Sequence, residues 1–146
     1  MIEIRECSGS DLLPCSILLQ KVYEEPPYNE SWSETRAAEY LETFFQMDPK
    51  GCFVATDQER ILGAIFTYGY PWSTGAILFI QELFVSKQER CKGIGRRLVA
   101  RAVATKGKDI TVALIVREGT AAAEFYEKVG LPKNKYYVLR SGKISA

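Results

Sequence analysis

The segment that most constrains the fold is residues 82–98, where an apolar strand pattern leads through a glycine turn into a helix pattern. It reads ELFVSKQERCKGIGRRL, and Gly93 and Gly95 stand where the helix should begin. Glycine allows backbone conformations that turn several N–H groups toward one point. The first N–H groups of a helix have no partner inside the helix and carry partial positive charge. The segment therefore predicts an anion site suited to phosphate or pyrophosphate.

Two familiar phosphate-binding motifs do not fit this turn. A P-loop requires Gly-Lys-Ser/Thr, whereas Gly95 is followed by two arginines. A dinucleotide-binding fold requires a third glycine, and Leu98 stands at that position. The alternative without a ligand is a basic helix start with two turn glycines, because short glycine motifs are weak signals.

The rest of the chain alternates between strand and helix patterns. The three middle strands are joined by short turns and should be antiparallel, whereas the next strand follows a helix and should run parallel to its neighbour. The continuous apolar run at 110–116 is typical of a central strand covered on both faces. We expect one α/β domain over residues 1–146, a mixed sheet covered by helices. Strands are expected near 2–6, 52–56, 60–70, 76–85, 110–116 and 135–140, and helices near 12–22, 34–45, 94–103 and 120–129.

Composition excludes several kinds of site. The 146 residues include no histidine, which excludes histidine zinc ligands, histidine bases and Ser-His or Cys-His triads, and we expect no metal. A net charge of +1 argues against a nucleic-acid partner held by bulk charge. The four separated cysteines form no CxxC pair and predict reduced thiols in the cytoplasm. We find no signal-peptide pattern at the start and no apolar run long enough to span a membrane, so no membrane partner is expected.

A second landmark follows the run at 110–116, because residues 122–131 read AAEFYEKVGL. Residues 90–95 fit the R/Q-x-x-G-x-G/A signature of the GNAT superfamily of N-acetyltransferases, and residues 122–131 resemble that family's A-x-x-F-Y-E-K-x-G-F. The two landmarks lie in the family's order and at its spacing, so the chain resembles the family over about residues 60–131. The resemblance implies the GNAT fold, a mixed, mostly antiparallel sheet whose parallel strands 4 and 5 splay apart. It also implies acetyl-CoA as co-substrate.

The resemblance further implies how acetyl-CoA would be held. Backbone groups near Phe84 and Val85 would pair with the pantetheine arm as if it were an added strand, and the glycine turn would hold the pyrophosphate. Gly119 stands where the family often has an asparagine that bonds the pantetheine, so we expect weaker or water-mediated anchoring there. The expected cofactor-binding residues are Phe84, Val85, Arg90, Cys91, Lys92, Gly93, Ile94, Gly95, Arg96, Ala122 and Phe125.

Two side chains are candidates for catalysis. By resemblance, Tyr126 would protonate the leaving thiolate, although its apolar stripe alone would make it a core aromatic. A backbone N–H near Phe84 or Val85 could stabilise the oxyanion. Because the chain has no histidine, Glu82 is the best candidate for the base, and partial burial would raise its pKa toward a useful value. The alternatives for Glu82 are an anchor for the amine or a structural partner of an arginine or a backbone group.

The acceptor is expected near residues 24–34, which read EEPPYNESWSE. Acids beside aromatic rings suit a cationic amine through charge and cation–π contact, although a solvated surface loop is the alternative. The expected acceptor-binding residues are Glu25, Tyr28, Glu30 and Trp32. We therefore predict an N-acetyltransferase that moves an acetyl group from acetyl-CoA to a primary amine of a small molecule. A protein or peptide N-acetyltransferase and a non-catalytic acyl-CoA-binding module are the alternatives, and the oligomeric state, a homodimer included, is left open.

Overall fold

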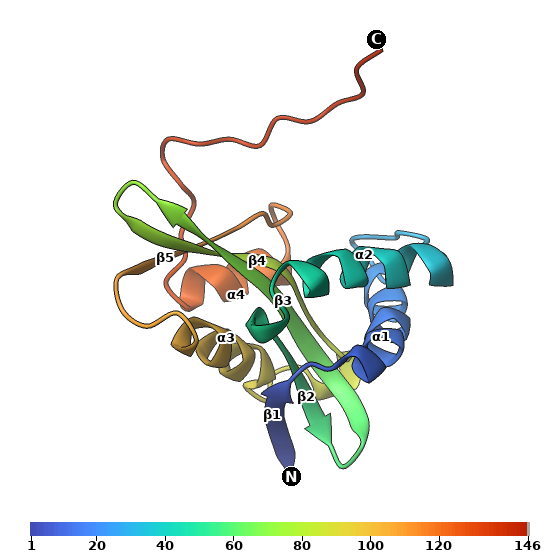
Figure 1. Ribbon diagram of the computed structural model, residues 1–146. Coiled ribbons are helices and arrows are strands. Elements are labelled where there is room, and N and C mark those ends of the chain that lie inside the picture. Colours follow the sequence, from blue (N-terminus) through green and yellow to red (C-terminus); the bar gives the residue numbers. More distant parts are fainter. Residues whose placement is uncertain (146) are drawn as a thin grey trace. The chain divides into compact units, whose positions relative to one another are not determined.

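The computed structural model describes residues 1–145 and separates into two compact units, one from Met1 to Leu114 and one that begins at Ile115. The first unit is built on a five-stranded sheet whose strands lie in chain order (Figure 1). The first four strands pair antiparallel, and the fifth pairs parallel with the fourth, so the predicted mixed sheet is confirmed. The strands are β1 (Ile2–Glu6), β2 (Cys52–Asp57), β3 (Arg60–Trp72), β4 (Gly75–Val85) and β5 (Ile110–Leu114).

Helices cover both faces of this sheet. They are α1 (Leu12–Glu24), α2 (Glu34–Met47) and α3 (Ile94–Ala104). The first two pack on one face, and α3 packs on the other (Figure 1). Successive side chains of a strand point to opposite faces. Ala64 and Phe66 of β3 therefore join the core under α1 and α2, while Ile65 between them is buried on the α3 side.

Polar side chains stabilise the segment before α1 and the start of α2. Before α1, Asp11 forms an ion pair with Arg5, and the Arg5 Nη1 to Asp11 Oδ2 distance is 2.7 Å. The hydrogen bond from Arg5 holds the pKa of Asp11 below its ordinary value. Ser33 caps α2, because its Oγ accepts a hydrogen bond from the backbone N–H of Arg36 at 3.1 Å.

A β-bulge in β4 determines which way the predicted base points. Phe66 of β3 pairs with Glu82, but the next residue, Thr67, pairs with Ile80, so Gln81 is an extra residue in β4. One inserted residue reverses the alternation of side chains beyond it. Glu82 therefore lies on the face that α1 and α2 cover, as Phe66 opposite does.

The pairing between β4 and β5 is short. It joins residues 76–80 of β4 to β5 and stops there, although β4 continues to Val85. Within the first unit, the last part of β4 is therefore paired with β3 on one edge and open on the other. This is the separation of strands 4 and 5 that the family resemblance predicts.

Two predictions about the end of the sheet are wrong. Residues 135–140, predicted as a closing strand, form no strand, and Tyr136 is 86% exposed. The run at 110–116 is not a central strand, because β5 is the last strand of the sheet among the described residues and Ile115 after it is 60% exposed. Apolar and β-branched side chains favour a strand, but a strand also needs a neighbouring edge to pair with.

The second unit holds one helix in its described part, α4 (Ala121–Lys128). Thr120 caps this helix, because its Oγ1 accepts a hydrogen bond from the backbone N–H of Ala123 at 3.1 Å. The same hydroxyl donates to the carbonyl of Arg117 at 2.8 Å. The Thr120 side chain thus fixes where the predicted helix begins.

Candidate active site

Glu82 lies at the centre of a hydrogen-bonded group contributed by three elements. Its Oε1 accepts a hydrogen bond from the hydroxyl of Tyr23 on α1 at 2.6 Å, and its Oε2 accepts one from Tyr40 on α2 at 2.7 Å. Distances of about 2.5–2.7 Å are typical of hydroxyls that donate to a charged carboxylate. No lysine or arginine within residues 1–145 forms a salt bridge with Glu82. The carboxylate is thus held by phenols and is not neutralised by a cation of that part of the chain.

Gln81 fixes the direction of the second of these bonds. Its Nε2 donates to the Tyr40 hydroxyl oxygen at 2.9 Å. An amide NH₂ group can only donate, so the Tyr40 oxygen accepts this bond and its own proton points to Glu82. The bulge in β4 thus brings two neighbouring side chains, Gln81 and Glu82, to one tyrosine.

The surroundings of Glu82 raise its pKa. Burial disfavours the charged form and raises the pKa above the ordinary glutamate value, while the bonds from Tyr23 and Tyr40 act in the opposite direction and the charge of Glu30 adds to the rise. Burial also raises the pKa of both tyrosines, which therefore stay protonated donors near neutral pH. A carboxylate in this state is suited to accept a proton from a substrate.

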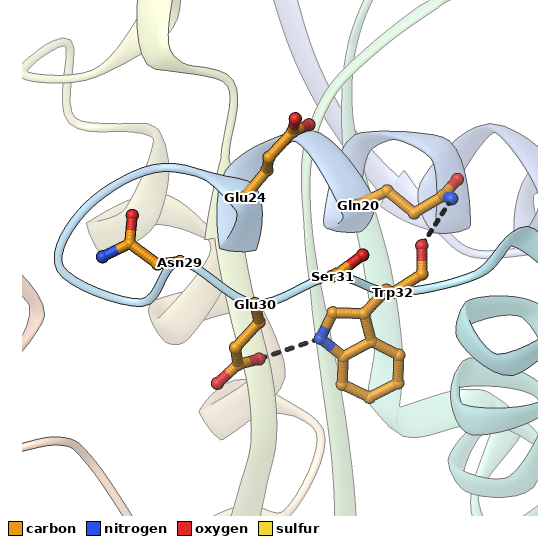
Figure 2. Close-up of a pocket in the computed structure, with 6 residues that line it drawn as sticks. All are labelled: Gln20, Glu24, Asn29, Glu30, Ser31 and Trp32. Carbon is orange, nitrogen blue, oxygen red and sulfur yellow. Dashed lines mark hydrogen bonds between the residues drawn. The ribbon is translucent and has the colours of Figure 1, made fainter.

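A pocket of about 300 Å³ lies at the connection between α1 and α2 (Figure 2). Trp32 is held there by its indole N–H, which donates to Glu30 Oε1 at 2.8 Å, and by its carbonyl, which accepts from Gln20 Nε2 at 2.9 Å. The Trp32 ring centroid lies 5.1 Å from that of Tyr40, which bonds to Glu82. Two of the four predicted acceptor-binding residues, Glu30 and Trp32, therefore belong to the pocket. Its lining residues are Gln20, Glu24, Asn29, Glu30, Ser31 and Trp32.

The other two predicted acceptor-binding residues lie outside the lining of this pocket. Glu25 faces the glycine turn instead, with its Oε2 3.8 Å from Arg90 Nη1 and 3.9 Å from Lys87 Nζ. Tyr28 packs edge-on against Tyr23, with 4.9 Å between the ring centroids. Glu25 thus connects the segment between α1 and α2 to the glycine turn, and Tyr28 supports a tyrosine that bonds to the predicted base.

The turn before α3 has a backbone suited to an anion. Cys91 and Gly93 have φ values of 65° and 80°, and Gly93 is the residue that precedes the first turn of the helix. Glycine adopts this left-handed conformation without strain. No side chain in the described part of the chain caps α3, whereas α2 and α4 are capped. The first N–H groups of α3 therefore remain available to a ligand.

The basic side chains of this turn have different partners. Lys92 Nζ bonds to Glu89 Oε2 at 2.8 Å, and Arg90 Nε donates to the carbonyl of Val85 at 3.1 Å. Arg96 is exposed in the first turn of α3 and has no salt-bridge partner among residues 1–145. Arg96 is thus the cation of this group that is best placed to meet a phosphate.

The open edge of β4 offers backbone groups to a ligand. The N–H of Ser86 donates to the carbonyl of Leu62 at 2.8 Å, which fixes the hydrogen-bonded positions of the antiparallel pair. Because these positions alternate, Leu83 and Val85 direct their backbone groups away from β3, toward the open edge. Phe84 between them is buried in the core under α1 and α2. A ligand with amide groups can pair with such an edge as an added strand.

The second sequence landmark forms α4, which carries three predicted site residues, Ala122, Phe125 and Tyr126. The Phe125 and Tyr126 rings meet edge to face at 5.2 Å between centroids. Gly119, in place of the family's asparagine, has a φ of 75°, which glycine adopts without strain. The departure from the family pattern at Gly119 thus falls at a backbone position that favours glycine.

Sequence reasoning missed the roles of Tyr23 and Tyr40. Neither tyrosine is among the residues predicted for the site. The available signal was Glu82 itself, because a carboxylate within a buried strand must find hydrogen-bond donors. Tyrosines on the apolar stripes of the two preceding helices are donors that can reach such a site.

Other kinds of site find no support in the described residues. Residues 1–145 contain no group of three or more His, Cys, Asp or Glu side chains that could hold a metal ion. All four cysteines are free thiols, and burial raises the pKa of Cys52 to about 12. None of the helices within residues 1–145 combines the length and the apolar character needed to cross a membrane.

Comparison with known proteins gives a family. Residues 19–131 match the model of the acetyltransferase (GNAT) family, while no curated protein matches the chain. Among solved structures, a possible acetyltransferase from Clostridium difficile 630 has a TM-score of 0.80 and 21% identity over 99% of both chains. An aminoglycoside acetyltransferase from an uncultured soil metagenomic sample, in complex with sisomicin, has a TM-score of 0.70 and 18% identity, over 99% of this chain and 97% of the other. Arabidopsis thaliana Naa50, in complex with the bisubstrate analogue CoA-Ac-MVNAL, has a TM-score of 0.65 and 17% identity, over 88% of this chain and 82% of the other.

The family match covers most of the chain and includes both the glycine turn and α4. The chain belongs to the acetyltransferase (GNAT) family. It is therefore an acetyltransferase, and acyl-CoA is the donor that this family uses. The predicted family, fold class and enzyme class are confirmed, whereas the assignments of individual site residues stay predictions.

Proposed function

We propose that this enzyme moves an acetyl group from acetyl-CoA to a primary amine of a small cationic molecule by direct transfer. The observation that carries the proposal is Glu82, a carboxylate that accepts two phenolic hydrogen bonds and has no salt-bridge partner among residues 1–145. It is linked through Tyr40 and Trp32 to a pocket that carries further acids. Such a site attracts an ammonium group and can then take its proton.

The residues of the first unit fit the donor in two places. The uncapped start of α3 and the exposed Arg96 suit the pyrophosphate. The outward backbone groups of Leu83 and the outward N–H of Val85 suit the pantetheine amides, while the Val85 carbonyl accepts the bond from Arg90 Nε. When bound, acetyl-CoA supplies the activated acetyl group as a thioester.

Two side chains of this chain are proposed to move protons during the transfer. Glu82 accepts a proton from the acceptor ammonium, so that the amine nitrogen can form a bond to the acetyl carbon. A backbone N–H of β4 near Val85 stabilises the oxyanion. On the family resemblance, Tyr126 then gives a proton to the sulfur as the carbon–sulfur bond breaks. As the amide forms, its nitrogen loses the remaining extra proton to solvent. The proton from Tyr126 is replaced from solvent, and Glu82 releases its own proton there.

The pocket between α1 and α2 indicates the chemistry of the acceptor. Glu24, Glu30 and Trp32 line it, so that it carries negative charge and an aromatic ring. In Figure 2 the Glu30 and Trp32 side chains lie together, whereas the Glu24 side chain points away from them. A cation is attracted both by carboxylates and by an aromatic face. We therefore propose a polyamine, an aminoglycoside or a similar small amino compound. The free thiols fit our proposal that the enzyme works in the cytoplasm.

An amine panel tests this function. The wild type is incubated with acetyl-CoA and, in turn, with spermidine, an aminoglycoside, a neutral small amine and a peptide with a free N-terminus. Amine-dependent release of CoA thiol is measured, and mass spectrometry identifies the acetylated product. We expect a cationic small amine to give the highest kcat/KM.

Other outcomes of this panel contradict the proposal in distinct ways. Turnover with the peptide alone would favour a peptide N-acetyltransferase. Tight acetyl-CoA binding without turnover of any amine would favour a non-catalytic acyl-CoA-binding module. For Tyr126→Phe we expect kcat to fall by about 10²-fold or more while the Kd for acetyl-CoA changes little, because the ring is kept and the proposed proton donor is removed.

A further inference from the structure

We propose that Tyr23 and Tyr40 are positioning residues that hold both oxygens of Glu82, so that the carboxylate stays oriented and ready to accept a proton. The inference rests on the proposed function, in which Glu82 is the base. It adds two residues that the family resemblance does not single out, each on a different helix.

The geometry shows a carboxylate whose two oxygens are held separately. Tyr23 donates to Oε1 at 2.6 Å and Tyr40 donates to Oε2 at 2.7 Å. Rotation of the carboxylate about its last bond would break both contacts at once. Gln81 donates to the Tyr40 oxygen at 2.9 Å and so directs the Tyr40 proton toward Glu82. One lone pair on each carboxylate oxygen remains for the proton of a substrate.

The hydroxyls of Tyr23 and Tyr40 are the groups that favour the charged form of the Glu82 carboxyl group. Besides Tyr23 and Tyr40, the titratable group that acts on Glu82 is Glu30 of the connecting loop, which is negative and disfavours a second negative charge. The cross-strand neighbour on β3 is Phe66, which is apolar. No cation among residues 1–145 pairs with Glu82. Without the phenols, burial would favour the neutral acid, which cannot accept a proton.

The two donors also connect the base to the acceptor pocket. They lie on the helices that flank the pocket loop, and the ring of Tyr40 packs on that of Trp32 at 5.1 Å between centroids. Tyr28 of the same loop packs on Tyr23 at 4.9 Å. The loop that is proposed to bind the acceptor therefore also supports the two tyrosines that hold the base.

The direct test is a titration of the Glu82 carboxyl group by ¹³C NMR, in protein labelled at the glutamate side-chain carboxyl carbon. Glu82→Gln identifies the resonance. In Tyr23→Phe and in Tyr40→Phe we expect the midpoint to rise by about one pH unit or more, because each change removes one donor to the charged form. Glu30→Gln should move the midpoint the opposite way. Tyr68→Phe is the matched control, since Tyr68 stacks on Phe44 and Phe79 and is not a donor to Glu82.

The pH profile of kcat/KM is the second readout. Each phenylalanine variant keeps its ring and should fold, and its acidic limb should move to higher pH as the titration midpoint does. A purely structural role would lower the rate at every pH and leave the limb in place. Unchanged midpoints and limbs in both variants would overturn the inference. Because the NMR titration needs no turnover, it decides the inference separately from the amine panel, whose failure would overturn the proposed function instead.

Discussion

A carboxylate placed in a buried strand is stable only when its oxygens are hydrogen-bonded. Glu82 meets this condition through two tyrosines, and its pKa still lies above the ordinary glutamate value because of burial. At the glycine turn before α3, the hydrogen-bond donors are instead backbone N–H groups. Gly93 takes a φ of 80° there and no side chain of residues 1–145 caps the helix, so the first N–H groups of α3 are available to a phosphate.

Glu82→Gln tests the base. The amide keeps the shape of the side chain but cannot accept the proton, so we expect kcat/KM to fall by about 10²–10⁴-fold. In the wild type, activity should be lost as the pH falls through the raised pKa of Glu82, because the protonated form is inactive. The variant should lack this acidic limb, and its Kd for acetyl-CoA should match the wild type. A variant with wild-type kcat/KM would show that Glu82 is not the base.

Arg96→Ala tests the phosphate contact. Removal of an exposed cation at the start of α3 should raise the KM for acetyl-CoA by about five- to tenfold and leave kcat nearly unchanged. Arg101→Ala is the matched control, because this arginine of the same helix lies over the ring of Phe53 at 4.7 Å, away from the turn. Equal effects of both variants on KM would contradict the assigned phosphate contact.

The helices and strands show which parts of the fold a local sequence pattern can predict. The predicted strand at 76–85 is observed as Gly75–Val85, and the predicted helix at 120–129 as Ala121–Lys128. Periodicity and caps predict such elements because they are local. The strand predicted at 135–140 did not form, because a strand also depends on a partner edge that the local pattern does not specify.

The candidate site also has a part that local sequence predicts and a part that it does not. The glycine turn and the start of α3 could be predicted, because the glycines and the following helix are contiguous in sequence. The bonds of Glu82 could not, since Tyr23 and Tyr40 lie 59 and 42 positions away along the chain and reach it only after α1 and α2 pack on the sheet. The bulge at Gln81 was not predicted either, because a bulge depends on the register with the neighbouring strand.

Ser33→Ala tests the start of α2, the helix that carries Tyr40. Loss of the hydrogen bond from the Arg36 N–H should lower the free energy of unfolding by about 1 kcal/mol, measured by urea denaturation. Ser33→Asp is the control, because aspartate also caps helices and should keep the stability close to the wild type. If both variants were equally destabilised, the cap would not explain the contribution of Ser33.

At the scale of the whole molecule, the two family landmarks fall in different compact units. The glycine turn and Glu82 belong to the first unit, and Tyr126 belongs to the second. The family match spans both, from residue 19 to residue 131. A ligand that binds only the native state raises the stability of the folded chain by mass action, and the rise grows with ligand concentration. We therefore expect a donor bound at the turn before α3 to stabilise the folded chain.

Thermal unfolding in the presence of acetyl-CoA is the most direct test of the central claim, that the turn before α3 binds the diphosphate of the donor. At about 100 times the Kd, we expect the Tm to rise by about 5–10 °C and to keep rising with the logarithm of the concentration. A short acetyl thioester that lacks the nucleotide and diphosphate should produce no such shift, and Arg96→Ala should need more acetyl-CoA for the same shift. An unchanged Tm at millimolar acetyl-CoA, or an equal shift with the short thioester, would contradict the account.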